Sequence, residues 1–443
     1  MPDTSTAAPG VVHLGLGAFH RAHQAMVFDT LLQQGDPRWG VLGVAMRSAA
    51  VADALRAQAG RYSVQVASAQ GREWQVVESI RATCVAAQQP QAVMDAIAAP
   101  ATRWITLTVT EKGYGPALAA LIVGGLAQRH RAGLPGLTIA SCDNLSGNGD
   151  KLRALCLQGA TDPALQEWIA TACAFPNSMV DRIVPAATEA ARAHAAQALG
   201  WRDEAALATE GFWEWVLQDR LADPLDAAVL ASAGVQVVPD IAPYETAKLR
   251  MLNGSHSAMA AMGAVLGLPT ICDCITDTAI KAFVEGLMTQ EVMPHVTRPQ
   301  PEAYRDALLA RFANPALQHS VHQVATDSTQ KIPQRWVPAA LDQFRAGGPV
   351  EHLAFASAAW IRYALGEDEA GRSYDLNDPL AAQVMAGARA HRGNAAATAH
   401  ALLGLTAVWG HQLPANPVWR ARVTHWLGRI QGAGLRAALA EVR

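Results

Sequence analysis

Three polar residues of types that can do chemistry lie within one short stretch, KLRMLNGSH (248–256). Lys248 carries a titratable amine, Asn253 an amide that donates and accepts hydrogen bonds, and His256 a titratable ring. The stretch continues as SAMAAMGAVLG, a run of helix-forming residues that predicts a helix through about Val265. We therefore ask what these three side chains do on one helix.

The start of this helix and its periodicity place the three residues on one side. Pro243 and Glu245 suit a first turn, proline for its fixed φ and glutamate for the positive end of the helix. At about 100° per residue, Asn253 lies ~140° and His256 ~80° around from Lys248. The same arc carries three apolar residues: Leu249, Leu252 and Met259. The pattern predicts a lysine on an apolar helix face.

Each of the three residues also has a structural interpretation. A lysine is rarely fully buried unless it is paired or used. Lys248 can instead extend its ammonium group to the surface along the apolar face. Asn253 can bond a neighbouring backbone group, and His256 can be an ordinary core histidine. The residues alone leave these alternatives open.

A glycine turn near the N-terminus is the second candidate site. The segment HLGLGAFH (13–20) places Gly15 and Gly17 after an apolar run and before a predicted helix, HRAHQAMVFDTLL. In a dinucleotide fold the first glycine makes the tight turn, and the second lets the pyrophosphate approach the backbone. Ala18 and Phe19 follow, and His20 stands where the third glycine of the pattern belongs. The turn predicts NAD binding, with an ordinary glycine-rich turn as the alternative.

The end of the second predicted strand leaves the choice of cofactor open. NAD enzymes of this type place an acidic residue there for the ribose hydroxyls, but this strand ends in Ala-Met-Arg47-Ser. Arg47 can pair with the 2′-phosphate of NADP, stack on adenine or end a solvated strand. His20 and Arg21 can reach phosphate or substrate, or can lie at an exposed helix start. NAD is the predicted cofactor, and NADP is not excluded.

Alternating strand and helix patterns predict an α/β fold. Apolar strands at 11–17, 39–46, 104–114 and 137–144 alternate with helices, which argues for a doubly wound, mostly parallel sheet. Two alternating runs around Gln70-Gly71 predict a hairpin, and GVQVVPD (234–240) a last strand. The patterns after Pro243 are nearly all helical. We expect a Rossmann-like dinucleotide-binding domain over 1–240 and a mainly α-helical substrate domain over 241–443.

Composition limits the class of protein. The chain has 443 residues, 51% of them apolar and 16% charged, with a net charge of −3. This charge gives no argument for binding nucleic acid or an acidic membrane. No apolar run reaches the ~20 residues that span a bilayer, and no secretory signal is evident. The six cysteines are too sparse for a disulfide framework and lack a zinc-type ligand set. We expect a cytoplasmic protein with reduced thiols and no metal.

Six motifs occur in order over about residues 11–335: GLGAFHRAHQ (15–24), TVTEKGY (108–114), SCDN (141–144), FPNSMVDRIVP (175–185), APYETAKLRMLNGSH (242–256) and DSTQKIPQR (327–335). The Lys-x4-Asn-x2-His pattern is the most specific of them. Together they resemble the polyol-specific long-chain dehydrogenases, a family that includes mannitol dehydrogenases and the fructuronate (D-mannonate) and tagaturonate reductases.

The resemblance implies catalysis without zinc, with Lys248 as general acid/base. It makes Asn253 and Asn144 the amide donors to the reacting oxygen, and His256 the residue that orients substrate or lysine. Amide donors stabilise the charge that develops on that oxygen, and an ammonium group donates the proton. Burial on an apolar face is expected to lower the pKa of the lysine toward neutrality. A turn-forming role is the alternative for Asn144.

The resemblance also implies contacts with the substrate and the nicotinamide. Asp181 matches a position that faces substrate hydroxyls, with a salt bridge to Arg182 as the alternative. Lys331 matches a cation near the substrate, with a solvated loop lysine as the alternative. Thr110 and Glu111 lie near the end of the apolar segment 104–114, where they are expected to border the nicotinamide.

The branch of the family depends on how a carboxylate would be bound. A sugar acid needs a cationic partner, and the predicted binding loop 327–335 offers Lys331 and Arg335, with Gln323 upstream; Arg362 is a further candidate. The loop is more similar to the uronate-reducing branch. We therefore expect a D-fructuronate/D-mannonate oxidoreductase, with a mannitol- or arabinitol-type polyol 2-dehydrogenase as the alternative.

Two other classes of protein fit the sequence less well. A nucleotide-sensing binding protein would not need Lys248, Asn253 and Asn144, and a zinc dehydrogenase would need ligands that the chain lacks. We expect a sugar acid or polyol as the small-molecule partner. The protein is expected to be a monomer or a dimer.

Overall fold

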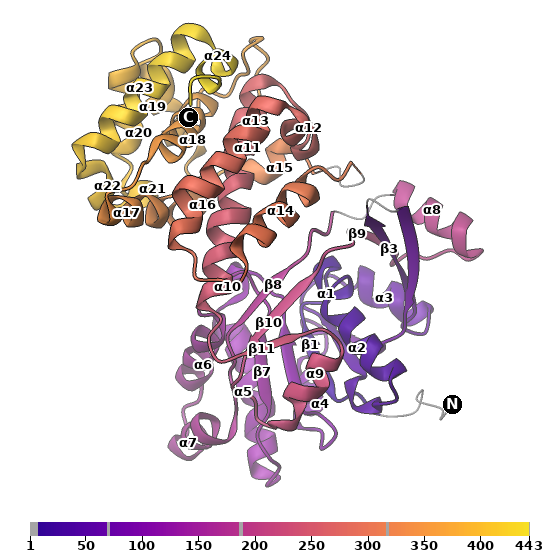
Figure 1. The fold of residues 1–443 in the computed structure, drawn as a ribbon. Helices are drawn as coiled ribbons and strands as arrows, with labels where there is room; N and C mark the ends of the chain where they lie inside the picture. The colour runs from indigo at the N-terminus through magenta and orange to yellow at the C-terminus, as the bar shows by residue number, and fades with distance from the viewer. Residues whose placement is uncertain (1–7, 69–70, 186–188, 316–318, 443) are drawn as a thin grey trace. The chain divides into compact units, whose positions relative to one another are not determined.

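The chain divides into two compact units, Met1–Ile241 and Ala242–Arg443, which are described separately. In the computed structural model of the protein, the described residues are 8–68, 71–185, 189–315 and 319–442 (Figure 1).

A five-stranded parallel sheet forms the centre of the first unit. In spatial order its strands are β5 (Ile80–Val85), β2 (Val41–Ala45), β1 (Val11–Leu14), β6 (Trp104–Leu107) and β7 (Thr138–Ser141). Counted along the chain, this order is third, second, first, fourth, fifth, which is the Rossmann arrangement. The order reverses at β1, so the carboxyl end of β1 lies at the switch point where such sheets bind ligands.

Both faces of this sheet are covered, because successive residues of β1 pack into different cores. Val11 belongs to a cluster that includes Phe28 of α2 (Gln24–Gln33). Val12 belongs to a second cluster that includes Ile122 of α5 (Pro116–Arg131). Strands buried on two faces are expected to be continuous apolar runs, and every residue of β1 and β6 is buried.

Two three-stranded sheets complete the first unit (Figure 1). One contains β11, β10 and β8, and the other contains β4, β3 and β9. The predicted hairpin is confirmed, since β3 and β4 pair in antiparallel register; of its predicted turn, residues 69–70 lie outside the described residues. The segment predicted as a last strand contributes β11, which pairs with β10. The bounds are β3 (Tyr62–Ser68), β4 (Gly71–Val77), β8 (Ser178–Asp181), β9 (Leu207–Glu210), β10 (Glu214–Gln218) and β11 (Gln236–Val238).

The single helix predicted after the glycine turn is wrong in one respect. It is divided into α1 (Ala18–Arg21) and α2, and His23 between them has φ −132° and ψ −94°, outside the helical region. The His23 ring stacks on Phe19 with 5.0 Å between centroids, and its Nε2 lies 3.0 Å from the main-chain oxygen of Glu214. These tertiary contacts override the local helix pattern.

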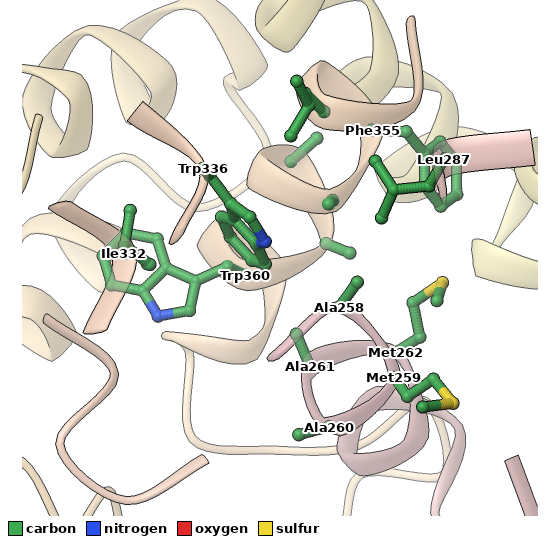
Figure 2. Close-up of a cluster of buried hydrophobic side chains, with 14 of the residues drawn as sticks. Ala258, Met259, Ala260, Ala261, Met262, Leu287, Ile332, Trp336, Phe355 and Trp360 are labelled. Carbon is green, nitrogen blue, oxygen red and sulfur yellow. The ribbon is translucent and has the colours of Figure 1, made fainter. Parts of the chain in front are cut away.

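The second unit is helical. Its central elements are α10 (Ala242–Ala247), a π-helix (Lys248–Asn253), α11 (Gly254–Leu266), α16 (Ser328–Arg335) and α18 (Glu351–Tyr363). Figure 2 shows residues of α11, α16 and α18 in one buried cluster, among them Met259, Trp336 just after α16, and Trp360. The predicted fold class, a Rossmann-like sheet followed by a mainly helical part, is confirmed. None of the helices within the described residues is both long and apolar enough to cross a bilayer.

Candidate functional site

The glycine turn lies at the carboxyl end of β1. Gly15 has φ +104°, and a Cβ there would lie 2.3 Å from the main-chain oxygen of Thr108. Only glycine fits this position without strain. A Cβ on Gly17 would meet nothing closer than the oxygen of Gly15 at 3.7 Å, so the backbone at Gly17 is open to close approach. The turn therefore has the form that a dinucleotide pyrophosphate requires.

His20 lies inside the first unit rather than at an exposed helix start. Its side chain is fully buried and stacks on His13 with 3.3 Å between ring centroids. Arg21 is buried as well, and its Nη1 donates to the main-chain oxygen of Ala205. Burial lowers the pKa of His13 to about 3 and the pKa of His20 well below its ordinary value. Both histidines are therefore neutral near pH 7, and the exposed-helix alternative is wrong.

Three candidate residues follow strands of the parallel sheet and are exposed. Arg47 follows β2, Thr110 follows β6 and Asn144 follows β7, all at the carboxyl edge. Glu111 is exposed beside Thr110. Because parallel strands point the same way, these residues lie at the edge that carries the glycine turn. The sheet thus places candidates for cofactor binding and the catalytic candidate Asn144 at one edge.

A buried aspartate that the sequence did not single out connects two of these strand ends. Asp143 accepts a 2.7 Å hydrogen bond at Oδ1 from the Thr110 amide and a 3.1 Å bond at Oδ2 from the Tyr114 hydroxyl. Burial raises the pKa of the Asp143 carboxyl above its ordinary value. The hydrogen bonds from main-chain amides lower that pKa and so offset part of the rise. Asp143 could have been identified from the sequence by its position next to Asn144, directly after a strand of the parallel sheet.

Asp181 is the last residue of β8 and is buried. The neighbouring Arg182 donates from Nη1 to the oxygen of Ala22 at 2.6 Å and from Nη2 to the oxygen of Glu210 at 2.9 Å. Burial lowers the pKa of Arg182 to about 10. Main-chain oxygens thus accept most of the described bonds of Arg182, and the sulfur of Met26 accepts one more, which accounts for this arginine in the interior.

The helix that carries Lys248 differs from the predicted geometry. Residues 248–253 form a π-helix, with α-helix before and after. Hydrogen bonds in a π-helix run from residue i to i+5, which widens the turn. Lys248 and Asn253 are five residues apart, so they lie more nearly in line than the ~140° expected for an α-helix. The predicted angle is therefore wrong, and the two side chains are brought closer in direction.

The three residues of this helix differ in burial. Lys248 is half-buried, whereas Asn253 and His256 are 7% and 6% exposed. The Nδ2 atom of Asn253 is buried and has no hydrogen-bond partner among the described residues. Buried amide donors are normally satisfied, so this atom points to a ligand or water that accepts from it. A donor of this kind is what a reacting oxygen needs.

His256 packs among rings. Its centroid lies 4.6 Å from that of Phe312 and 5.6 Å from that of His319, the second ring being almost perpendicular. The pKa of His319 is lowered by burial and by the nearby charge of Lys331. His319 was not singled out in the sequence, because its segment shows no periodic pattern beside it. These contacts connect His256 to the segment that carries Lys331.

The segment predicted as a binding loop is the helix α16. Asp327 before it has φ +56°, and the Asp378 carboxylate accepts from the Thr329 amide at 2.8 Å and the Ser328 hydroxyl at 3.1 Å. Asp378 thus accepts hydrogen bonds from the first turn of the helix, as the side chain of a local N-cap residue would. The loop prediction is wrong because this capping residue lies about 50 residues away in the chain.

Lys331 and Arg335 lie one turn apart on α16. Lys331 is half-buried, and its Nζ donates a 3.1 Å bond to the oxygen of Val324. Burial and the charge of Arg335 lower the pKa of Lys331 to about 8. The alternative of a solvated loop lysine is therefore wrong.

The Arg335 side chain is buried next to the π-helix. Its Nη1 donates to the main-chain oxygen of Asn253 at 3.0 Å and to Oγ of Ser257 at 2.6 Å. Burial lowers the pKa of Arg335 to about 9. Gln323 is exposed on α15 (Val321–Ala325), and Arg362 donates to the main-chain oxygen of Glu367 at 2.8 Å. The helical unit thus holds Arg335 against Asn253, with Lys331 one turn away on the same helix.

Comparisons with known proteins cover both units. The Mannitol dehydrogenase Rossmann domain matches residues 9–226, and the Mannitol dehydrogenase C-terminal domain matches residues 240–431. D-mannonate oxidoreductase of Escherichia coli is 35% identical, over 99% of this chain and 96% of that protein. Mannitol 2-dehydrogenase of Phaeosphaeria nodorum is also 35% identical, over 98% and 81%. A solved ternary complex of Pseudomonas fluorescens mannitol 2-dehydrogenase with NAD and D-mannitol matches with a TM-score of 0.86 at 30% identity, covering 99% of this chain and 94% of that one.

Proposed function

Because the chain belongs to the mannitol dehydrogenase family, we propose that it is an NAD-dependent, metal-independent oxidoreductase that interconverts a keto sugar acid and its hydroxy acid. The substrate pair is of the D-fructuronate/D-mannonate type. The family and the relatives establish the coarser statement, that the protein is an oxidoreductase acting on CH–OH groups of sugars or polyols.

The observation that carries the choice of a sugar acid is the pair of cations on α16. Arg335 is buried and Lys331 is half-buried, and burial lowers the pKa of each. A cation kept in such a place is stabilised when an anionic ligand binds beside it. A guanidinium group binds a carboxylate in a fixed geometry, and a polyol carries no such group. The D-mannonate oxidoreductase of Escherichia coli is among the relatives, which supports the same choice.

The catalytic roles follow from the donor groups of the helical unit and of β7. In reduction, Asn253 and Asn144 donate hydrogen bonds to the ketone oxygen as it gains negative charge. Lys248 then gives that oxygen a proton, and in oxidation it takes the proton back. His256 orients the substrate or Lys248. The partnerless Nδ2 of Asn253 supports the first of these roles.

The first unit supplies the cofactor site and a further substrate contact. Gly15 and Gly17, followed by Ala18 and Phe19, hold the pyrophosphate, and Thr110 and Glu111 border the nicotinamide. When bound there, NAD(H) would supply or accept the hydride at the substrate carbon. Arg47 lies where the adenosine ribose is expected, so it is the residue that sets the choice between NAD and NADP.

The remaining contacts are with substrate hydroxyls and the pyrophosphate. The Asp181 carboxylate accepts from substrate hydroxyls. His20 contributes only its backbone to the pyrophosphate site, because its ring is buried. Gln323, exposed on α15, is proposed as a further substrate contact.

The second candidate function is a mannitol-type polyol 2-dehydrogenase. It is favoured by the identity to the Phaeosphaeria nodorum enzyme and by the match to the complex with D-mannitol. In this case Lys331 and Arg335 would bind substrate hydroxyl groups rather than a carboxylate, and they would also stabilise the helix. The two functions share Lys248, Asn253 and Asn144 and differ only in the substrate contacts.

Oxidation of NADH and NADPH with D-fructuronate, D-tagaturonate and D-fructose in parallel separates the two functions. We expect kcat/KM for a uronate to exceed that for fructose roughly 10- to 100-fold, since a hydrogen bond to a charged group contributes about 1.5–3 kcal/mol. A preference for fructose would establish the polyol dehydrogenase instead. Turnover with none of the three would reject both substrate assignments.

A further inference from the structure

Thr110 has a backbone conformation that only glycine adopts readily. Its φ is +67° and its ψ is 165°, and it directly follows the loop at the end of β6. A non-glycine residue persists in this region only where its surroundings hold it, and such residues cluster at functional sites. The question is therefore which group holds Thr110 in place.

The holding group is the buried carboxylate of Asp143. It accepts the Thr110 amide at 2.7 Å and the Tyr114 hydroxyl at 3.1 Å, so it binds both ends of the loop 110–114. The Tyr114 hydroxyl also bonds Oγ of Ser141, at 2.5 Å, and the Asp143 amide donates to the same Oγ at 3.2 Å. Asp143 itself is only 6% exposed. The loop after β6 is thus fastened to the end of β7.

The main chain of Asp143 is fastened in turn to β8. The Nδ2 of Asn148 donates to the oxygen of Asp143 at 3.0 Å and to the oxygen of Ser178 at 2.9 Å, while the Ser178 amide donates to Oδ1 of Asn148 at 2.9 Å. Asn148 is fully buried. Ser178 begins β8, the strand that ends in Asp181. One chain of bonds therefore joins the segments that carry Thr110, Asn144 and Asp181.

We propose that Asp143 is a positioning residue for hydride transfer: it fixes the main chain at Thr110 and Glu111 relative to Asn144. The side chain touches the loop and not the reacting atoms, so it acts through these residues. The proposal rests on the proposed function, in which Thr110 and Glu111 border the nicotinamide and Asn144 donates to the reacting oxygen. A shift of the loop would separate the two partners of the transfer, and a misplacement of about 1 Å costs up to ~100-fold in rate.

The first test compares Asp143→Ala and Asp143→Asn with a matched control. Asp226 is also buried, but it accepts from the indole of Trp104 and from Arg103, at the opposite end of β6. We expect Asp143→Ala to lower kcat roughly 10- to 100-fold, with Kd for NADH changed less than about 3-fold. The isotope effect on kcat with 4-deuterated NADH should rise, because hydride transfer becomes rate-limiting. Asp143→Asn, which keeps an acceptor for Thr110, should restore part of the rate.

Asp226→Ala should lower the melting temperature but leave the isotope effect and the kcat of folded enzyme unchanged. The second test does not depend on activity. Amide hydrogen exchange of the segment 108–114 should become faster in Asp143→Ala and stay unchanged in Asp226→Ala. If Asp143→Ala fails to fold, Tyr114→Phe removes one of the two bonds to the carboxylate and should show smaller changes in the same direction.

The outcomes of the two proposals are distinguishable. Unchanged exchange of 108–114 in a folded Asp143→Ala variant would overturn the positioning role, as would an unchanged kcat and isotope effect. If the wild-type protein transfers hydride to no sugar or polyol, the proposed function fails, whereas faster exchange in Asp143→Ala would still establish that Asp143 holds the loop. If kcat falls equally in Asp143→Ala and Asp226→Ala, Asp143 stabilises the fold and has no positioning role.

Discussion

Arg335 donates a 3.0 Å hydrogen bond from Nη1 to the main-chain oxygen of Asn253. Arg335, which we propose binds a substrate carboxylate, therefore also supports Asn253, which we propose binds the reacting oxygen. A guanidinium group has five N–H donors, and the two described bonds use Nη1 alone. Arg335 can thus hold the π-helix and still face an anion.

Replacement of Arg335 should separate these two roles. We expect Arg335→Met to reduce kcat/KM for a uronate roughly 10- to 100-fold more than for fructose, because only the uronate loses a bond to a charged group. Fructose turnover should also fall, since Asn253 loses its support. Steady-state kinetics with both substrates measure the ratio. Arg420→Met, which removes an arginine bonded to the main-chain oxygens of Pro414 and Ala415 in the same unit, is the control that should leave the ratio unchanged.

The pH dependence of substrate binding should depend on Lys331. Its pKa is lowered to about 8, so the side chain is charged below that pH and neutral above it. We expect KM for a uronate to rise as the pH increases through about 8, because the anion loses a cationic partner. Fructose, which is neutral, should show no such rise. In Lys331→Met the KM for a uronate should be high at every pH, and a wild-type rise that persists in this variant would assign the titration to another group.

The parallel sheet was predictable because its signals are local. Each strand is a short apolar run, and Gly15 and Gly17 mark the turn after the first of them. A continuous apolar run is what a strand covered on both faces requires. The right-handed crossover rule limits the arrangements open to alternating strands and helices, and the observed strand order is one of those that remain.

Other features could not be predicted, because their causes are distant in the chain. The carboxylate of Asp378 accepts hydrogen bonds at the start of the helix α16. The break between α1 and α2 at His23 depends on a contact with the main-chain oxygen of Glu214. The π-helix at Lys248 has no signature in the hydrophobic pattern, which assumes a constant angle per residue. Asp143 was overlooked for a related reason, since its partners Thr110 and Tyr114 lie about 30 residues earlier.

Removal of the amine of Lys248 should abolish most of the turnover and leave cofactor binding intact. General acid–base catalysis contributes about 10²–10⁴-fold, so we expect Lys248→Ala to lower kcat by that factor. Kd for NADH, measured by fluorescence, should change little because the glycine turn lies in the other unit. Lys281→Ala, at an exposed lysine of α13 (Thr278–Gly286), is the matched control and should retain full activity. Loss of NADH binding in Lys248→Ala would instead indicate a role in folding.

The stacked pair His13 and His20 should make the first unit sensitive to acid. His13 is fully buried, its Nδ1 lies 2.8 Å from Oγ1 of Thr106, and burial lowers its pKa from 6.5 to about 3. The unfolded chain therefore binds a proton at this residue below about pH 6.5, whereas the folded chain binds it only near pH 3. The unfolded state is favoured as the pH falls, so the free energy of unfolding decreases by up to ~1.4 kcal/mol per pH unit for this group.

Urea titrations between about pH 7.5 and pH 4.5 measure this effect. In His13→Gln the free energy of unfolding should be lower at pH 7, because the hydrogen bonds of the ring are lost, and its dependence on pH should be weaker than in the wild type. His194→Gln, at an exposed histidine of α8 (Glu189–Leu199), should keep the wild-type dependence. A folded His13→Gln variant with the full wild-type slope would show that other groups cause the loss of stability in acid, carboxylates such as Asp36 first among them, since hydrogen bonds hold the pKa of that carboxyl below its ordinary value.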